Sequence, residues 1–250
     1  FMSSELRAKA REKLTGKWGK AACISLAYLV IAFLIGFIRG HIEEHSFLNL
    51  IVSIIVFIIE VPLSFGLVYS LYKLFKDEET FAFNFCSLGF SNFGRAWGVT
   101  WQTILKMIVP VILMIISYVL LAFSISLYVA SSFSYIYSGS TSGLGMAGLL
   151  SIVGIILLIF SVIWALTKYY YYALSYLIAM DNPEMTSKEA VEESKKLMND
   201  NRGKLFGLQM SFIGWAILAL FTFGIGYIWL IPYMQFATIC FYDKVKETNA

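Results

Sequence analysis

Six apolar segments, each about as long as a bilayer crossing requires, constrain the fold of this chain more than any other feature. The hydrocarbon layer is about 30 Å thick, and a helix crosses it with about 20 apolar residues. Of the 250 residues, 59% are hydrophobic and 14% are charged, whereas roughly 25% are charged in a soluble domain. A soluble core of this size could not enclose so much apolar surface. The six segments are Ala21–Ile38, Phe47–Tyr72, Val99–Ala130, Leu149–Met180, Phe206–Thr222 and Ile225–Phe241.

These segments predict an all-α, polytopic membrane protein with six transmembrane helices in a single domain, residues 2–250. Phe1, which stands before Met2, is interpreted as a cloning remnant and is left out. The first segment follows a basic stretch, as the apolar part of a secretion signal does. It is longer than the usual ~7–15 residues of such a signal and lacks a small-residue cleavage pattern. We therefore expect it to remain as the first span.

The lysines and arginines predict the orientation of the helices, because cytoplasmic loops carry an excess of them. In the six-span arrangement, all but one of the 19 lysines and arginines fall on one side, and the exception is Arg39. We therefore expect a multi-pass protein of the cytoplasmic membrane with both termini in the cytoplasm. The uncharged, serine-rich stretch 131–142 is then external.

The same short pattern precedes the first, third and fifth spans: a glycine, a cation, an aromatic residue and a second glycine. The cations of the three copies are Lys17, Arg95 and Lys204. A cation at the membrane interface can meet lipid phosphate while the aromatic ring lies among the headgroups. The pattern predicts that these three side chains contact anionic lipid at the cytoplasmic face, and it favours lipid over nucleic acid as the partner of the basic residues.

Amphipathic helices are expected before the first and fifth spans, lying on the cytoplasmic membrane surface. Apolar residues recur at helical spacing among charged ones in both places. The first stripe is Leu6, Ala10 and Leu14, and the second is Ala190, Val191, Leu197 and Met198. Thr186 and Glu189 stand at the spacing of a capping box and predict where the second surface helix begins.

The second and sixth spans share a proline followed ten residues later by a tyrosine, Pro62 with Tyr72 and Pro232 with Tyr242. Together with the three approaches, this favours three successive hairpins related by rotation about the membrane normal. The hairpins would comprise residues 2–75, 76–182 and 183–250. The alternative is that interfacial approaches collect these residue types by chance.

Glu60 is the one acidic residue well inside a predicted span. A carboxyl inside the membrane is costly and should face protein or water, and Pro62 loosens the helix beside it. The hypothesis is a ligand- or proton-handling site, with Lys106 as a candidate partner. The alternative is a neutral carboxyl that packs against a neighbouring helix. The other candidates, which share the helix face of Glu60, are Asn49, Ser53 and Ser64.

No motif predicts an enzyme or a cofactor. His41, Glu44 and His45 match the H-x-x-E-H pattern of inverted zinc peptidases, but the short loop that holds them offers no clear third protein ligand, so they are a weak metal candidate. The three cysteines are far apart and in no metal-binding spacing. No phosphate-binding glycine loop, Ser/His/Asp set or nucleotide fingerprint is present.

A set of residues in the carboxyl-terminal half carries a family resemblance: Ser194, Leu197, Met198, Gly203, Lys204, Phe206, 211–215, 224–226, Pro232, Tyr233, Phe241 and Tyr242. In these residues the chain resembles a bacterial membrane family known as domain of unknown function 975, and Leu14, Gly16 and Trp18 resemble the opening of that family. The resemblance implies a protein of the bacterial cytoplasmic membrane and no particular activity. The chain is also similar, more loosely, to the membrane domains attached to some bacterial glycerophosphodiester phosphodiesterases.

Three functions are compatible with this reasoning. The first is a non-enzymatic protein that binds or moves a small amphipathic or lipid-like molecule, in transport or envelope homeostasis. The second is a scaffold, regulatory or immunity-type protein that acts on a partner membrane protein and transports nothing. The third is intramembrane or metal-dependent hydrolysis, for which a paired nucleophile and base are missing from the sequence.

Overall fold

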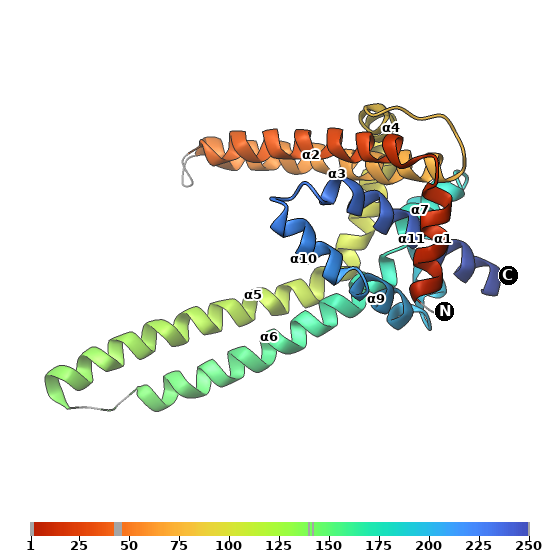
Figure 1. Ribbon diagram of the computed structural model, residues 1–250. Coiled ribbons are helices and arrows are strands. Elements are labelled where there is room, and N and C mark those ends of the chain that lie inside the picture. The colour runs from red at the N-terminus through yellow and green to blue at the C-terminus, as the bar shows by residue number, and fades with distance from the viewer. Residues whose placement is uncertain (1–2, 43–46, 140, 142, 250) are drawn as a thin grey trace. The chain divides into compact units, whose positions relative to one another are not determined.

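The structure, a computed structural model, describes residues 3–42, 47–139, 141 and 143–249, and every regular element within them is a helix (Figure 1). Residues 1–102 and 171–250 form one compact unit, and residues 103–170 form a second. The helices are α1 (Ser3–Leu14), α2 (Trp18–Gly40), α3 (Phe47–Phe75), α4 (Asn84–Ser91), α5 (Phe93–Ser138), α6 (Leu144–Tyr172), α7 (Ser175–Asp181), α8 (Ser187–Met198), α9 (Arg202–Met210), α10 (Ile213–Phe221) and α11 (Tyr227–Asn249).

Within the described ranges, five helical stretches are long and apolar enough to cross a membrane, so one of the six predicted spans is missing from this set. The predicted segment Ile225–Phe241 does form a helix, α11. Its apolar part ends at Asp243, which leaves it short of the ~20 apolar residues of a crossing. The five stretches are Trp18–Gly40, Phe47–Phe75, Phe93–Ser138, Leu144–Asp181 and Arg202–Phe221.

The second unit is an antiparallel hairpin made of α6 and the part of α5 that follows Gln102. Small residues bring its two helices together. The Ser124 hydroxyl donates a hydrogen bond of 3.0 Å to the Ala147 carbonyl oxygen and also contacts the Ser151 hydroxyl. A Cβ atom on Gly154 would lie 2.9 Å from the Leu121 side chain. Small and hydroxyl-bearing residues are typical of helix contacts in membranes.

In the first unit, α4 packs against the middle of α3 through two glycines. A Cβ atom on Gly66 would lie 1.9 Å from the Phe85 carbonyl oxygen, and one on Gly89 would lie 2.0 Å from the Pro62 carbonyl oxygen. Both distances are far below van der Waals contact, so the two backbones can approach this closely only where no side chain intervenes. This close contact between α3 and α4 lies beside Pro62, a proline within α3.

The helices predicted before the first and fifth spans are present as α1 and α8, but protein covers their apolar stripes. Leu6 is 2% exposed, and Ala10 and Leu14 are fully buried, since α1 packs on α11. Ala190, Val191 and Met198 of α8 are also buried. The expectation that these stripes face lipid is therefore wrong. Apolar periodicity shows that one face of a helix is covered and does not identify what covers it.

The capping box predicted for α8 is confirmed. The Thr186 hydroxyl accepts a hydrogen bond of 3.3 Å from the Glu189 backbone N–H, and the Glu189 carboxylate accepts one of 2.8 Å from the Thr186 backbone N–H. On the buried side of α8, the Ser194 hydroxyl donates to the Tyr171 carbonyl oxygen at 2.9 Å. These contacts determine both the start of α8 and its docking within the first unit.

Candidate functional site

A cavity of about 460 Å³ lies between α1, the start of α2, α10 and α11. Its size falls in the range of small-molecule sites, about 300–1,000 Å³. Three of the chain's six tryptophans line it, together with apolar side chains and one guanidinium. The lining residues are Arg11, Trp18, Trp215, Leu218, Ala219, Thr222, Gly226, Trp229, Leu230 and Tyr233.

Arg11 supplies the positive charge of this cavity. Its Nη1 donates a hydrogen bond of 2.9 Å to the Tyr233 hydroxyl, and its guanidinium carbon lies 6.0 Å from the centre of the Tyr233 ring. A guanidinium has five N–H donors. The Arg11 side chain is exposed, so its remaining donors can reach a ligand. An apolar cavity with a cation at one end suits an amphipathic molecule with an anionic head.

Tyr233 connects the arginine to the rest of the cavity wall. Its hydroxyl donates to the Arg7 carbonyl oxygen at 3.3 Å. Its ring packs edge-on against Phe212 and Trp18, with centroid separations of 4.9 and 6.0 Å. The Arg7 side chain in turn donates to the Ser211 carbonyl oxygen at 3.1 Å. These contacts hold α1, α2 and the chain between α9 and α10 around the same tyrosine.

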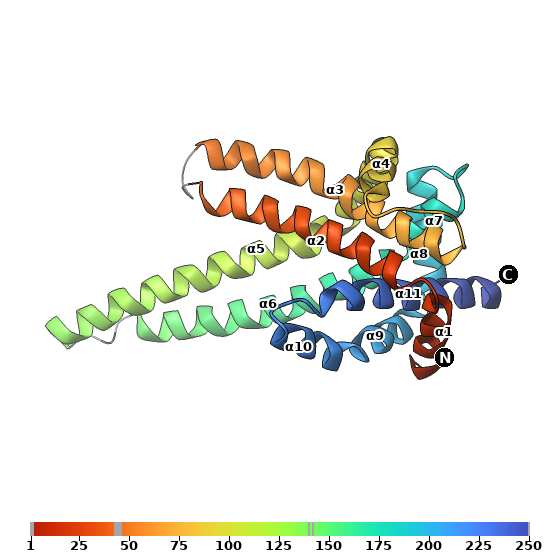
Figure 2. The ribbon, with the colours of Figure 1, turned by 45° about the horizontal axis from the view of Figure 1, so that its top comes forward.

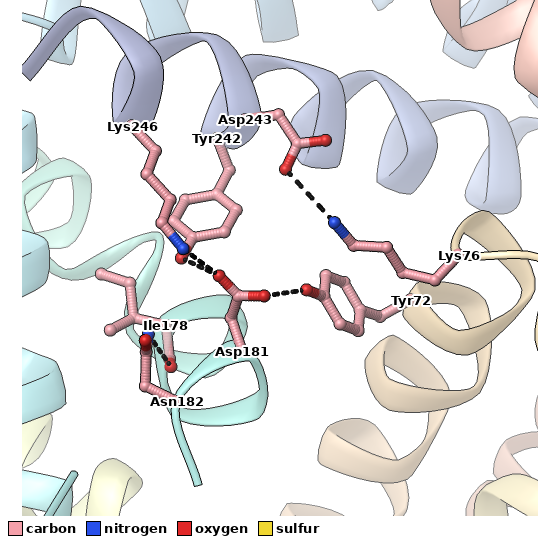
Figure 3. Close-up of polar contacts among 8 residues, drawn as sticks. All are labelled: Tyr72, Lys76, Ile178, Asp181, Asn182, Tyr242, Asp243 and Lys246. Atoms are coloured by element: carbon pink, nitrogen blue, oxygen red, sulfur yellow. Dashed lines mark hydrogen bonds and ion pairs between the residues drawn. The ribbon is translucent and has the colours of Figure 1, made fainter. Parts of the chain in front are cut away.

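A second polar cluster joins three helices at Asp181 (Figure 3). Tyr72 of α3 donates a hydrogen bond to one oxygen of the Asp181 carboxylate. Tyr242 and Lys246 of α11 donate to the other oxygen, at 3.0 and 2.5 Å. Asp181 was not among the predicted site residues, although the shared spacing of proline and tyrosine in the second and sixth spans indicated that Tyr72 and Tyr242 occupy similar positions. The cluster ties the end of α7 to α3 and α11.

Asp243 lies beside this cluster on α11, and its carboxylate pairs with Lys76 at 3.8 Å (Figure 3). Burial raises the pKa of Asp243 above the usual range of a carboxyl, and the ammonium of Lys76 offsets part of this effect. Asp181 adds a nearby negative charge, which also raises the pKa of Asp243. The ionised carboxylate of Asp243 is therefore disfavoured where it stands.

The residues predicted around Glu60 do not form an enclosed site in the first unit. The Glu60 side chain is exposed, and it lines a cavity of about 160 Å³ between α2 and α3 that Arg39 also lines. Within this unit, Glu60 therefore does not lie in the interior of a helix bundle, where the sequence had predicted it. Its predicted partner Lys106 belongs to the second unit, so their pairing stays a prediction.

Ser53 and Ser64, which share this face of α3, bond to groups other than Glu60. The Ser53 hydroxyl donates to the Asn49 side-chain oxygen at 3.3 Å and accepts from Arg39 at 3.4 Å. The Ser64 hydroxyl donates to the Val61 carbonyl oxygen of its own helix at 2.9 Å. Their contacts therefore leave Glu60 apart from the rest of the predicted set.

Two of the cations predicted to meet lipid phosphate bind backbone carbonyls at helix ends. Lys17 donates to the Leu74 carbonyl oxygen near the end of α3 at 3.0 Å. Arg95 donates to the carbonyl oxygens of Asn182 and Pro183, just after α7, both at 2.7 Å. Cations stabilise the carboxyl ends of helices, where carbonyls lack partners. These contacts give Lys17 and Arg95 a role inside the protein that the sequence pattern did not indicate.

The remaining contacts of these cations are also with protein groups. Lys17 pairs with Asp77 at 2.5 Å, and the hydrogen bond that it donates lowers the pKa of that carboxyl. Lys204 donates to the Asn201 side-chain oxygen at 2.8 Å. Contact of the three cations with lipid stays a prediction.

The weak metal candidate falls mostly outside the described residues, since Glu44 and His45 belong to the stretch 43–46. His41 is described, and one of its ring nitrogens lies 2.8 Å from the Phe37 carbonyl oxygen. Among the residues that the structure describes, no three histidine, cysteine or acidic side chains are placed to hold a metal ion.

The comparisons with known proteins agree with the resemblance carried by the two ends of the chain. No curated protein and no solved structure matches it. A family model described as "Protein of unknown function (DUF975)" matches residues 2–249. Since this match covers almost the whole chain, the protein belongs to the DUF975 family.

Proposed function

We propose that this protein binds a small amphipathic, lipid-like molecule in the cavity beside Arg11. The observation that carries the proposal is the pairing of an apolar, tryptophan-lined cavity of about 460 Å³ with a single guanidinium. Guanidinium groups form strong, directional hydrogen bonds with carboxylates and phosphates. The ligand therefore has an anionic head at Arg11 and an apolar chain against Trp215 and Trp229.

The proposal includes a location in the bacterial cytoplasmic membrane with both termini in the cytoplasm. The asymmetry of lysine and arginine along the sequence supports this orientation. Each of the three predicted hairpins returns the chain to the side of the membrane from which it started. Both termini therefore lie on the same side, whatever depth each hairpin reaches in the bilayer. The three-hairpin repeat is part of the same proposal and is supported by the convergence of Tyr72 and Tyr242 on Asp181.

Binding without transport is favoured over a carrier mechanism by the polar cluster at Asp181. A carrier alternates between two arrangements of its helices. The hydrogen bonds and ion pair of Asp181 link α3, α7 and α11 at their ends, and charge-assisted bonds of this kind are about twice as strong as neutral ones. They oppose relative movement of these helices. This favours a static binder that presents a ligand or senses it.

Quenching of tryptophan fluorescence tests the proposal directly. The full chain carries Phe in place of Trp97, Trp101 and Trp164, so that the three cavity tryptophans report alone. A brominated fatty acid and a brominated phosphatidylglycerol are titrated separately, which distinguishes a free acid from a membrane lipid. We expect saturable quenching by at least one of them, with a defined stoichiometry.

Two variants assign the quenching to the cavity. Arg11→Gln removes the guanidinium, and we expect about a tenfold weaker apparent affinity, equivalent to about 1.4 kcal/mol. Lys20→Gln is the matched control, because Lys20 is an exposed cation of α2 that does not line the cavity. Leu218→Phe narrows the cavity without adding a tryptophan and should also weaken binding. Quenching that rises without saturation, or that responds equally to the Arg11 and Lys20 variants, rejects the proposal.

A further inference from the structure

We infer that the third hairpin enters the hydrocarbon layer without crossing it, and that its apolar tip rests among lipid acyl chains. The hairpin consists of α10, the turn 222–226 and the apolar part of α11. The inference depends on the membrane location proposed above. It replaces the predicted fifth and sixth spans with a single re-entrant element.

The tip presents large apolar side chains outward. Phe223 is 98% exposed, Phe221 is 79% exposed and Ile225 is 58% exposed. The sequence has no charged residue between Lys204 and Asp243. A turn that emerged into water would place three such side chains in contact with it, whereas monomeric soluble surfaces rarely gather large apolar side chains in this way. Hydrocarbon is the medium that this tip fits.

The backbone of the turn is hydrogen-bonded within itself. The N–H groups of Phe223 and Gly224 donate to the carbonyl oxygens of Leu220 and Ala219, both at 3.0 Å. Phe223 and Gly224 both have positive φ angles, 52° and 85°, and this left-handed pair turns the chain so that the bonds can form. Non-helical backbone inside a membrane requires such internal partners, because lipid offers none.

Thr222 is the one hydroxyl of the turn, and it is also used internally. Its hydroxyl donates to the Ala219 carbonyl oxygen at 2.8 Å and accepts from the Gly226 N–H at 2.9 Å. The Ile225 N–H donates to the Thr222 carbonyl oxygen at 3.1 Å. These polar groups are therefore bonded within the turn, whereas the side chains of Phe221, Phe223 and Ile225 are exposed.

The tips of the other two hairpins are polar. The described residues near the turn between α2 and α3 include Arg39 and His41, and those between α5 and α6 include Ser138 and Thr141. Such residues suit a turn that emerges into water. The turn of the third hairpin has no charged residue, and its one hydroxyl, that of Thr222, is bonded within the turn.

The length of α11 agrees with partial entry, although the stretch Arg202–Phe221, taken through the break between α9 and α10, is long enough to cross. Trp18, the first residue of α2, contacts Tyr233 of α11 with a centroid separation of 6.0 Å. From that level α2 continues to Gly40, about 33 Å at 1.5 Å per residue, whereas α11 continues only to Tyr227, about 9 Å. A fully stretched path from Tyr227 to Phe223 would add at most about 14 Å, so the tip would still lie short of the end of α2. Figure 2 shows the α2–α3 hairpin extending beyond the α10–α11 turn.

Cysteine labelling of the full chain tests the inference. The background carries Cys23→Ala, Cys86→Ser and Cys240→Ala, and single cysteines are placed by Phe223→Cys and Ile225→Cys. A membrane-impermeant maleimide is added to spheroplasts and to inverted vesicles. We expect neither tip variant to label from either side, and both to label after detergent is added.

Two controls separate this inference from the proposed topology. Ser4→Cys should label only in inverted vesicles, and Ser138→Cys only in spheroplasts. If these controls fail, the membrane orientation is wrong. If they hold and a tip variant labels in spheroplasts, the hairpin crosses the membrane and the inference is overturned. Disulfide-linked dimers of the Phe223→Cys variant would overturn it too, because they would identify a second copy as the partner of the tip.

Discussion

Tyr72 and Tyr242 donate hydrogen bonds to opposite oxygens of one carboxylate, that of Asp181. Each tyrosine stands ten residues after a proline, Pro62 in α3 and Pro232 in α11. The two helices therefore approach α7 in the same register, as two copies of one structural unit would. The polar cluster is also the main side-chain link among these three helix ends.

The first prediction concerns the two tyrosines. Tyr72→Phe and Tyr242→Phe each remove a hydrogen bond to a charged group, and we expect each to lower the free energy of unfolding by about 1.5–3 kcal/mol. The effects should not add, because the two residues share one acceptor. Thermal unfolding in detergent measures this. Tyr137→Phe, at an 86% exposed site in the second unit, should leave the melting temperature unchanged.

The second prediction concerns the pH dependence of stability. Because burial raises the pKa of Asp243 in the folded state, the contribution of this group favours folding below the unfolded pKa of about 3.9 and is lost as pH rises through the folded value. Asp243→Asn should therefore raise the melting temperature at pH 7, and the gain should vanish near pH 3.

Asp77 provides a control of opposite sign for this experiment. The hydrogen bond from Lys17 lowers the pKa of Asp77, so its contribution is present above the unfolded value and is lost as pH falls through the folded one. Asp77→Asn should lower the melting temperature at pH 7, and this loss should shrink as pH falls below about 3.9. If the Asp243 and Asp77 variants shift in the same direction at pH 7, the assigned environments are wrong.

The third prediction concerns the contact between α3 and α4. Gly66→Ala and Gly89→Ala would each place a Cβ atom about 2 Å from a backbone oxygen, so the helices must separate. We expect losses of at least about 1–3 kcal/mol, the usual cost of overpacking. Gly36→Ala is the matched control, since its Cβ atom would meet nothing within 4 Å. Expression yield and thermal unfolding report the difference.

The fourth prediction concerns the start of α8. Thr186→Ala removes the side-chain cap, and we expect a loss of about 0.5–2 kcal/mol. Thr186→Asp keeps a hydrogen-bond acceptor at the same position and should retain most of the stability that Thr186→Ala loses. Hydrogen exchange of the first turn of α8 is the appropriate measurement, because the effect is local. Equal exchange in both variants would show that the cap adds no stability.

The fifth prediction concerns the hypothesis of a functional Glu60. Glu60→Gln keeps the size of the side chain and cannot titrate, so it should preserve expression and abolish any pH dependence of ligand binding. Glu60→Leu tests the alternative, since an apolar residue can often replace a polar group that serves only packing. If both variants bind ligand like the wild type across pH 5–8, Glu60 has no part in the function.

The sequence predicted where helices lie, because long apolar runs and a capping box act locally. It did not predict the breaks between α6 and α7 and between α9 and α10, which fall inside predicted spans. The tight turn after Phe221 and the start of α8 at Ser187 follow the predicted pattern closely. The partners of the surface helices could not be predicted in the same way. The stripe around Ala10 has the same spacing whether lipid or α11 covers it.

The cavity escaped prediction for a related reason. Arg11 and Tyr233 are separated by 222 positions in the sequence, and no local pattern connects residues so distant. Glu60 attracted attention because a carboxyl in an apolar run is visible in the sequence. The cavity tryptophans were not distinctive there, because aromatic residues are expected in any membrane protein.

The burial of α1 against α11 has a consequence for the order in which the protein is made. α1 leaves the ribosome first and its partner last, and at ~5–20 residues per second the interval is on the order of ten seconds or more. During that time Leu6, Ala10 and Leu14 have no protein to cover them. Given the membrane location proposed above, we expect the adjacent lipid surface to cover this stripe in the nascent chain. α1 would then move from lipid to protein once α11 is made.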